Sequence, residues 1–266
     1  KRLVALTSML SEPTIYVIDI GGSVIDMRMF TLYCPTYSDD ILPDVAQFAD
    51  AMDFSADNSS LLFDTYNAMQ IGDHNVGFWE INLMSVWNPA ASTFADGKIF
   101  RLYPQEPNIN LANPTFARNK PGIITFDLKN SEDRTGFIIA SDLYAKDSKP
   151  LSEIAFTESG FPAFRGDDAV VSFASSGLSS TGADSIFNVP LAADAITPTG
   201  PPHGFIPSGM FPIWYRQGTR PTSTDRPERA LPETFLVLDN YPNPFNPSTT
   251  ITMQLAHPMR ARIIIQ

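Results

Sequence analysis

The side chains with the clearest capacity for chemistry are aspartates that occur close together. A glycosidase needs two such carboxylates across a cleft, and a calcium site needs several carboxylate or carbonyl oxygens. Two of them, Asp57 and Asp167, lie in polar stretches that predict hairpin turns, where aspartate bonds the local backbone. The sequence contains no Asp-x-Asp-x-Asp-Gly calcium loop. We therefore expect the aspartates to be turn residues rather than catalytic residues or metal ligands, and calcium binding stays open as an alternative. The acidic positions are Asp39, Asp40, Asp44, Asp53, Asp57, Asp167 and Asp168.

Nucleophiles and nitrogen ligands give no catalytic pattern. Cys34 is the only cysteine, and no histidine lies near it in sequence. The three histidines, His74, His203 and His257, are far apart and lack the spacing of a zinc site. A Gly-x-Ser-x-Gly nucleophile elbow and a glycine-rich phosphate loop are both absent from the sequence. We expect no cofactor.

Three aromatic residues are the candidates for ligand binding. Trp79, Trp87 and Tyr103 could stack against a carbohydrate or a peptide. Aromatic residues in alternating strands, however, more often fill the space between sheets. The sequence leaves both interpretations open.

The elements that must position these residues are repeated hairpins. Each of three segments has an aromatic residue, a polar turn and an apolar strand that ends in phenylalanine, which is typical of a β-hairpin. The segments are 52–63, 114–126 and 162–173, and further strands are predicted at 2–6, 14–20, 77–83, 98–103, 136–143, 153–156 and 185–191.

The hairpins recur at intervals that suit propeller blades. The interval is 62 residues from Phe54 to Phe116 and 48 residues from Phe116 to Phe164. Periods of this size with about four strands per copy predict a β-propeller, with a β-sandwich of irregular hairpins as the rival fold. The run Phe-Ser-Ala-Asp-Asn at 54–58, followed by Leu-Leu-Phe at 61–63, resembles the repeat of TolB-like β-propellers. That resemblance implies blades and no particular activity.

The repeats cover residues 1–196 and account for about three and a half blades, fewer than a closed propeller needs. We therefore expect further blades before Lys1, or a partner chain that covers the exposed sheet edges. Residues 197–232 are a proline-rich linker, and its apolar stretches around Phe205 and Trp214 predict docking on the last blade.

The last segment, residues 233–266, carries a motif of alternating proline and asparagine before a strand-like run. Proline excludes helix and central sheet, so the motif predicts an ordered turn that leads into a strand. It resembles the opening of the C-terminal sorting domain of type IX secretion cargo, which implies a small Ig-like β-sandwich, here truncated. The resemblance also implies recognition by the type IX secretion machinery and delivery to the exterior or outer-membrane surface of a Gram-negative bacterium. The matching residues are Asn240, Tyr241, Pro242, Asn243, Pro244, Phe245, Asn246, Pro247, Ser248 and Thr249.

Composition agrees with an exported all-β protein. Of 266 residues, 23 are proline and only 18% are charged, which favours turns and strands over long helices. The net charge of −11 repels phosphate backbones and argues against a nucleic-acid partner. No run of apolar residues is long enough for a transmembrane helix.

The sequence therefore predicts a partial β-propeller with a truncated Ig-like sorting domain, acting outside the cell as a non-catalytic binding or assembly module. Its ligand would be a protein or a carbohydrate. Two alternatives stay open, namely an extracellular hydrolase with carboxylates in the propeller mouth and a structural subunit of a surface assembly.

Overall fold

The protein is built from antiparallel β-sheets. The computed structural model describes residues 3–7, 13–21, 24–33, 45–71, 73–104, 106, 108–144, 146–214, 235–241 and 250–255, and these contain strands and turns but no helix. Accordingly, the described residues hold no apolar helix of membrane-spanning length. The chain divides into two compact units, Lys1–Arg216 and Gln217–Gln266.

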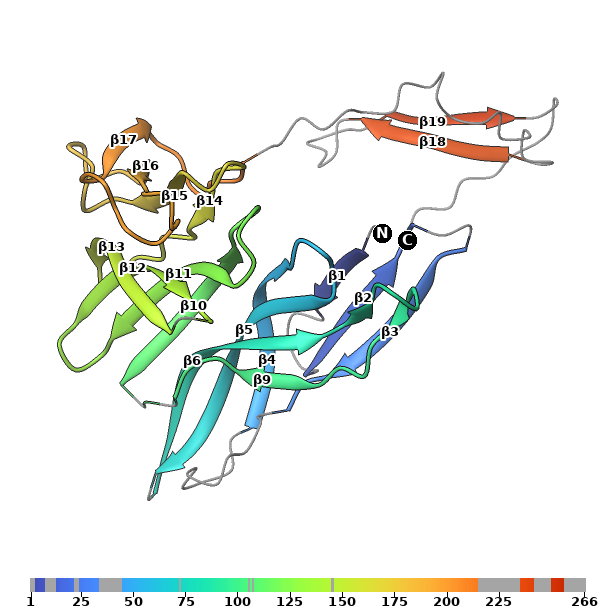
Figure 1. The fold of residues 1–266 in the computed structure, drawn as a ribbon, viewed down its shortest axis with the longest axis horizontal. Helices are drawn as coiled ribbons and strands as arrows, with labels where there is room; N and C mark the ends of the chain where they lie inside the picture. Colours follow the sequence, from blue (N-terminus) through green and yellow to red (C-terminus); the bar gives the residue numbers. More distant parts are fainter. Residues whose placement is uncertain are drawn as a thin grey trace. The chain divides into compact units, whose positions relative to one another are not determined.

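Four larger sheets and one short two-stranded hairpin are described in the first unit, and in each sheet the strands follow chain order (Figure 1). The first sheet has three strands, β1 (Leu3–Thr7), β2 (Thr14–Asp19) and β3 (Asp26–Thr31). The second has four, β4 (Val45–Phe54), β5 (Ser60–Ile71), β6 (His74–Ser85) and β9 (Ile99–Arg101), with the hairpin β7 (Trp87–Asn88) and β8 (Thr93–Phe94) inserted before β9.

The third and fourth sheets are also four-stranded antiparallel meanders. The third contains β10 (Ile109–Phe116), β11 (Ile123–Asn130), β12 (Thr135–Asp142) and β13 (Asp147–Ala155). The fourth contains β14 (Ala163–Phe164), β15 (Val170–Ser175), β16 (Ser185–Pro190) and β17 (His203–Ile206).

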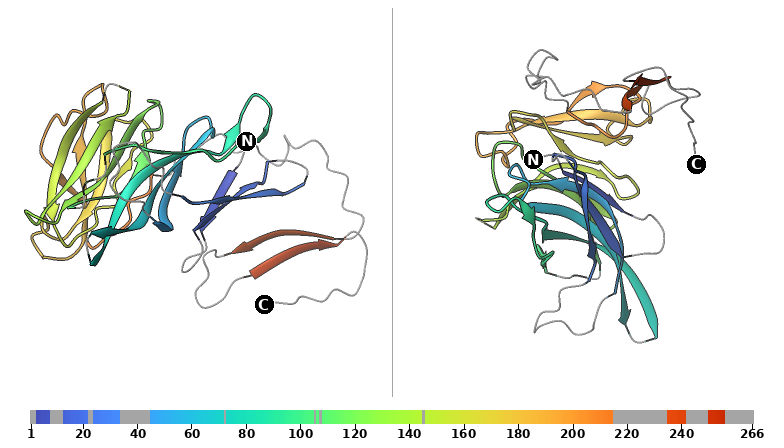
Figure 2. Two further views of the ribbon diagram at one scale, coloured as in Figure 1. Left: turned by 90° about the horizontal axis from the view of Figure 1, so that it is seen from below. Right: turned by 90° about the vertical axis from the view of Figure 1, so that its right-hand side faces the viewer.

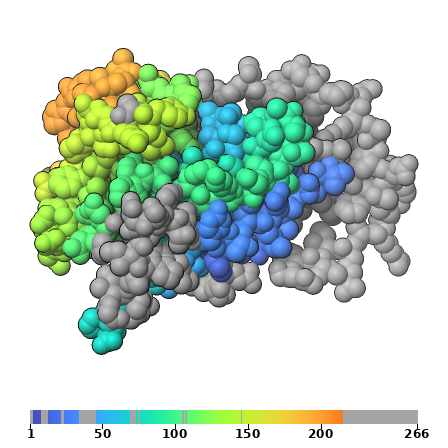
Figure 3. Space-filling view, turned by 60° about the horizontal axis from the view of Figure 1, so that its bottom comes forward, coloured from blue at the N-terminus to red at the C-terminus, as the bar shows by residue number. Residues whose placement is uncertain are grey.

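The four sheets stack face to face in series, and an apolar core fills each gap (Figure 2). Because side chains alternate along a strand, Leu61 and Phe63 of β5 face the first sheet while Leu62 faces the third. In the same way, Phe126 of β11 faces the second sheet, and Phe173 of β15 faces the third. The chain order of the stack is visible on one surface of the unit, where blue, teal and yellow-green regions follow one another (Figure 3).

The repeated hairpin turns have matching geometry. Ser55 N–H donates to the Ser60 carbonyl at 2.9 Å, and Arg165 N–H donates to the Val170 carbonyl at 2.8 Å. Asn58 and Asp168 occupy the same left-handed position, with φ of 62° and 60°. Aspartate and asparagine tolerate this conformation better than other side chains, which explains their place in the predicted turns.

One strand of the first sheet lies outside the predicted segments. β3 (Asp26–Thr31) is mostly exposed, and the alternation of its polar and apolar residues ends after Met29. The strand predicted at 14–20 is β2, and its pair Ile18-Asp19 matches Phe63-Asp64 of β5, so β2 is the second strand of its sheet.

The second unit contains one described hairpin, β18 (Phe235–Tyr241) paired with β19 (Thr250–Leu255). The sorting-like motif begins at the end of β18, where Asn240 pairs with Ile251 and Tyr241 pairs with Thr250. Residues 242–249, which hold the prolines of the motif, lie outside the described residues.

Candidate functional site

Two buried aspartates mark the seams between neighbouring sheets. Asp64 and Asp127 directly follow Phe63 and Phe126 in β5 and β11, so each points from its own sheet toward the next. Asp64 is 1% exposed and Asp127 is fully buried. A buried carboxylate must be paired or hydrogen-bonded, so their partners show what they do.

Asp64 joins the first strands of the second and third sheets. Its Oδ1 accepts the N–H of Ala51 at 2.8 Å and that of Asp50 at 3.2 Å, at an irregularity in β4. Its Oδ2 accepts the N–H of Asn113 at 2.8 Å, at the bulge in β10. Burial raises the pKa of Asp64 to about 7, although these backbone N–H groups oppose the shift.

Asp127 makes the equivalent connection from the third sheet to the fourth. Its Oδ2 accepts Asn113 Nδ2 at 2.8 Å and the N–H of Gly160 at 2.9 Å. Burial raises its pKa to about 6, while hydrogen bonds from Asn113, Gly160 and Phe161 oppose the shift. Its Oδ1 accepts no hydrogen bond of ordinary geometry. Asn113 therefore lies between the two aspartates and bonds to both.

A small hollow opens beside this pair of seams. Its volume is about 160 Å³, below the roughly 300–1,000 Å³ of ordinary small-molecule sites. Lys129 lies on its wall and donates from Nζ to Ser159 Oγ at 3.2 Å. The lining residues are Asp50, Asp64, Trp79, Asn110, Ala112, Asn113, Asp127, Lys129, Ser159 and Phe161.

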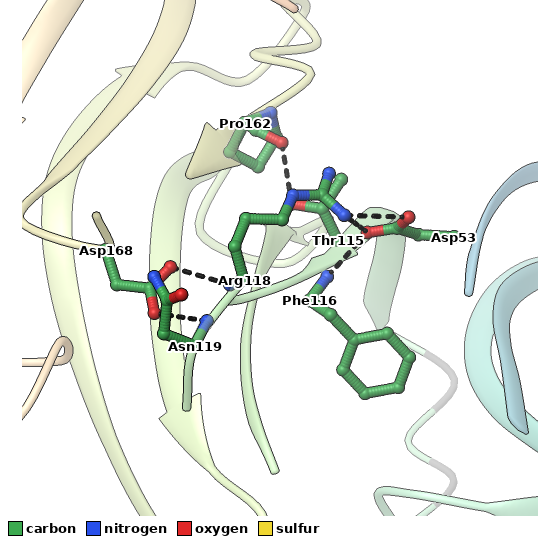
Figure 4. A network of polar contacts seen from close by, with 7 residues as sticks. All are labelled: Asp53, Thr115, Phe116, Arg118, Asn119, Pro162 and Asp168. Atoms are coloured by element: carbon green, nitrogen blue, oxygen red, sulfur yellow. Dashed lines mark hydrogen bonds and ion pairs between the residues drawn. The ribbon is translucent and has the colours of Figure 1, made fainter. Parts of the chain in front are cut away.

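A second set of cross-sheet contacts lies at the turn ends of the same first strands (Figure 4). Asp53 of β4 accepts the N–H of Phe116 at 2.9 Å and pairs with Arg118 at 3.1 Å. Asp168 of the fourth sheet accepts the N–H groups of Arg118 and Asn119 at 2.6 and 2.7 Å. Burial raises the pKa of Asp53, and the Arg118 charge opposes this.

The chemistry of these carboxylates is mainly that of hydrogen-bond acceptors. Both oxygens of Asp64 are engaged with backbone N–H groups, and Asp53 is paired with a cation. A general acid or base must reach its substrate within hydrogen-bond distance, which a carboxyl that is 1% exposed does not do. Among the described residues, no group of three or more His, Cys, Asp or Glu side chains could hold a metal ion.

The three aromatic candidates line three different hollows. Trp79 borders the 160 Å³ hollow and packs on Phe48 and Tyr66, with ring centroids 5.6 and 5.4 Å away. Trp87 is 4% exposed, packs edge-on against Phe94 and borders an open hollow of about 720 Å³.

Tyr103 borders a mainly apolar hollow of about 310 Å³ and packs on Phe126 at 5.2 Å. Burial raises its pKa to about 12. The structure thus does not bring Trp79, Trp87 and Tyr103 together into one binding surface.

The acidic positions singled out by sequence separate into three groups. Asp39, Asp40 and Asp44 lie outside the described residues, as does Cys34. Asp57 and Asp167 accept N–H groups two residues ahead, as their turn composition predicts. Asp53 and Asp168 connect neighbouring sheets, which the sequence analysis did not anticipate.

Sequence reasoning also missed Asp64 and Asp127. A signal was present, because an acidic residue follows a large apolar residue, Ile18, Phe63 or Phe126, at the same place in three second strands. An acidic side chain inside an otherwise apolar strand is costly unless it is bonded, so its repetition indicates a shared backbone partner.

The first sheet has a second notable surface, on the side away from the second sheet. Ile15 and Val17 are fully buried toward the second sheet, whereas Met27 and Met29 point the other way and are 54% and 63% exposed. We call this surface the open face. Its residues are Val4, Leu6, Tyr16, Ile18, Met27 and Met29.

No protein-family model matches the chain, and no curated protein matches it. Among solved structures it is similar to TolB from Acinetobacter baumannii, with 13% identity and a TM-score of 0.42 over 74% of this chain and 41% of that one. It is also similar to Porphyromonas gingivalis dipeptidyl peptidase 4, with 11% identity and a TM-score of 0.41 over 74% of this chain and 30% of that one.

Both structures contain β-propellers, but likenesses with TM-scores this low do not establish a shared fold. The chain spans 41% and 30% of the lengths of these two proteins, less than half of each.

Proposed function

We propose that this chain is an exported, non-catalytic binding or assembly module made of propeller-type blades, with its C-terminal segment acting as a type IX secretion signal. The observation that carries the assembly role is the open face, a contiguous apolar surface on the first sheet. Exposed apolar patches of this kind mark interaction sites in soluble proteins.

The blade assignment is supported by strand order and stacking. Three sheets are four-stranded meanders in chain order, and successive sheets bury a core between their faces. Radial repetition of four-stranded sheets is the architecture of a propeller. The proposed unit is a set of blades.

The export role is supported by the motif at Asn240–Thr249. In the proposal this motif and the hairpin of β18 and β19 belong to an Ig-like sorting domain, which the secretion machinery recognises. The protein would then act outside the cell or on the outer-membrane surface, on a protein or carbohydrate partner.

Deletion tests the export proposal. The full chain, a version without residues 233–266 and a version with residues 240–249 in scrambled order would be expressed in a bacterium with type IX secretion. We expect only the full chain outside the cell, measured by protease accessibility of intact cells and by analysis of the medium. The scrambled version keeps length and composition, so it is the matched control. Equal delivery of all three would overturn the proposal.

The non-catalytic role is supported by the engagement of the buried carboxylates with backbone N–H groups. One observation favours the hydrolase alternative, namely that Asp64 and Asp127 converge on Asn113 and have raised pKa values of about 7 and 6. Raised carboxyl pKa values are common at catalytic sites. Hydrolysis of chromogenic glycosides or peptides that is abolished by Asp127→Asn, with folding preserved, would support the enzyme instead.

A further inference from the structure

The apolar hollow beside Tyr103 has the size of a small-molecule site. Its volume is about 310 Å³, within the roughly 300–1,000 Å³ range of such sites. Its floor is one face of the third sheet, where strand pairing sets Leu111 beside Leu128 and Phe126 beside Ile139. Pro150 pairs with Ile139 and continues the floor onto the outer strand β13. All four strands of the third sheet therefore contribute to one apolar floor.

The hollow begins where the outer strand of the second sheet ends. β9 contains three residues and pairs with β6 at three positions, whereas β13 of the third sheet contains nine residues. Tyr103 and Pro104 follow shortly after β9 and line the hollow. The Tyr103 ring packs on Phe126 with centroids 5.2 Å apart, so it forms a wall that stands on the floor. The outer part of the floor extends beyond β9 and is left without a strand over it.

Leu128 of the floor departs from the repeat in the direction that an apolar ligand requires. It stands two residues after the phenylalanine of its strand, and Thr65 and Ser175 stand at that place in β5 and β15. Thr65 and Ser175 are buried, whereas Leu128 is only half-buried and lines the hollow. An apolar side chain gains free energy when it is removed from water, so an apolar molecule in the hollow would be stabilised by covering Leu128.

The polar side chains of the hollow restrict the chemistry of its ligand. Ser148 and Glu106 line the hollow and are exposed to water, so they mark its open side. The Ser148 hydroxyl can donate or accept a hydrogen bond. Among the described residues that line the hollow, Glu106 alone carries a formal charge, and the chain has a net charge of −11. Both charges repel an anion, so the hollow favours an uncharged ligand.

We propose that this hollow binds a small uncharged apolar molecule with one polar end, such as a hydroxyl or a carbonyl group. The apolar body lies on the floor formed by Leu111, Phe126, Leu128 and Ile139, and the polar end lies near Ser148 at the open side. Mainly apolar walls with a few polar groups that fix orientation are the usual construction of small-molecule sites. This activity goes beyond the protein or carbohydrate partner of the proposed function, and it is independent of the export signal.

Fluorescence titration of the full chain tests the site. The probe is N-phenyl-1-naphthylamine, an uncharged molecule whose emission rises in apolar surroundings. Ser148→Phe places a ring at the open side of the hollow, and Ser152→Phe, in the same strand but outside the lining, is the matched control. We expect saturable binding to the wild type and the control, and binding to Ser148→Phe that is weaker by about tenfold or more. Absence of saturable binding to the wild type, equal binding to all three proteins, or equal weakening in both variants would overturn the proposal.

Methyl NMR locates the probe without any substitution. Leu128 and Ile139 line the hollow, whereas Ile206 and Met27 are 44% and 54% exposed on other surfaces. We expect the methyl signals of Leu128 and Ile139 to shift as the probe is added, and those of Ile206 and Met27 to keep their positions. Shifts at Ile206 or Met27 without shifts at Leu128 and Ile139 would place the probe on an exposed surface and contradict the proposal.

Discussion

The first and the fourth sheets are the two ends of one stack, and they differ in what covers their outward faces. β15 and β16 of the fourth sheet are buried along nearly their whole length. Their outward positions include the apolar Val170 and Ile186 as well as Ser172, which accepts a hydrogen bond from Trp214. β2 and β3 of the first sheet instead present Ile18, Met27 and Met29 outward without such a cover from the described residues.

This difference shows that the outward faces of the two sheets are covered to different extents. The fourth sheet is covered by the segment that follows it, because Trp214 donates to Ser172 and Gly209 lies close to Ile186. The first sheet presents Met27 and Met29 outward, with exposed fractions of 54% and 63%. Exposed apolar surfaces of this kind mark interaction sites in soluble proteins.

Replacing a residue in an interior gap should have the largest effect on stability. Phe173 is fully buried between the third and fourth sheets. Phe173→Ala should lower the free energy of unfolding by about 4 kcal/mol, because it removes a large side chain and leaves a cavity. Urea denaturation measures this, and an effect as small as that of an exposed residue would contradict the stacked arrangement.

Removing the carboxylate at the seam should come next. Asp64→Ala leaves the N–H groups of Asp50, Ala51 and Asn113 without their acceptor. We expect a loss of about 3 kcal/mol in the free energy of unfolding. Asp64→Asn keeps one acceptor oxygen and should cost less. An Asp64→Ala protein as stable as the wild type would show that the seam is not held by this side chain.

Uncovering the fourth sheet should have an intermediate effect. Trp214 stacks on Phe205 with centroids 5.7 Å apart and donates to Ser172. Trp214→Ala should lower the free energy of unfolding by about 2 kcal/mol and expose an apolar surface, detected by binding of a hydrophobic dye. The free energy of unfolding of Trp214→Phe, which keeps an aromatic ring and loses the N–H donor, should lie between those of the wild type and Trp214→Ala. If Trp214→Ala left the free energy of unfolding unchanged, Trp214 would not be a stabilising cover of the fourth sheet, and the difference between the first and fourth sheets would not hold.

The pH dependence of stability should reflect the two seams. The pKa values of Asp64 and Asp127 are about 7 and about 6 in the folded state, above the ordinary value of 3.8. The folded state therefore binds more protons than the unfolded chain, and their contribution is present at low pH and lost as pH rises through 6 and 7.

We expect the free energy of unfolding to fall between about pH 4 and about pH 7 and to level off above that. Urea midpoints measured across this range should show the fall in the wild type and a reduced slope in Asp64→Asn. A slope of the opposite sign, or one unaffected by the substitution, would show that these carboxyls do not titrate in this way.

Changing the open face should have the smallest effect on the folding of a single chain. Met29 is 63% exposed, so Met29→Ala should change the free energy of unfolding by less than about 0.5 kcal/mol when measured in dilute solution. A loss comparable to that of Phe173→Ala would show that the face is already covered within one chain.

The sequence predicted the hairpins well because their signals are local. The turns at 55–59 and 165–169 need aspartate or asparagine at fixed offsets, and the strands that follow them are long apolar runs. The sequence could not show whether Trp79, Trp87 and Tyr103 share a surface, because that depends on how the sheets stack.

The cross-sheet bonds were beyond local reasoning for the same reason. Asp64 meets Asn113 across 49 residues, and Asp168 meets Arg118 across 50. Only alignment of the repeats would have pointed to the acidic position in the second strand. β3 was not predicted either, because its polar and apolar residues alternate over only four positions, Asp26 to Met29.

Methionine oxidation tests most directly the central claim that the open face is uncovered in a single chain. Met27, Met29 and Met210 are all about half exposed, whereas Met84 is fully buried. In dilute solution, mild peroxide treatment followed by mass spectrometry should oxidise the first three and spare Met84. Protection of Met27 and Met29 to the level of Met84 would contradict the account.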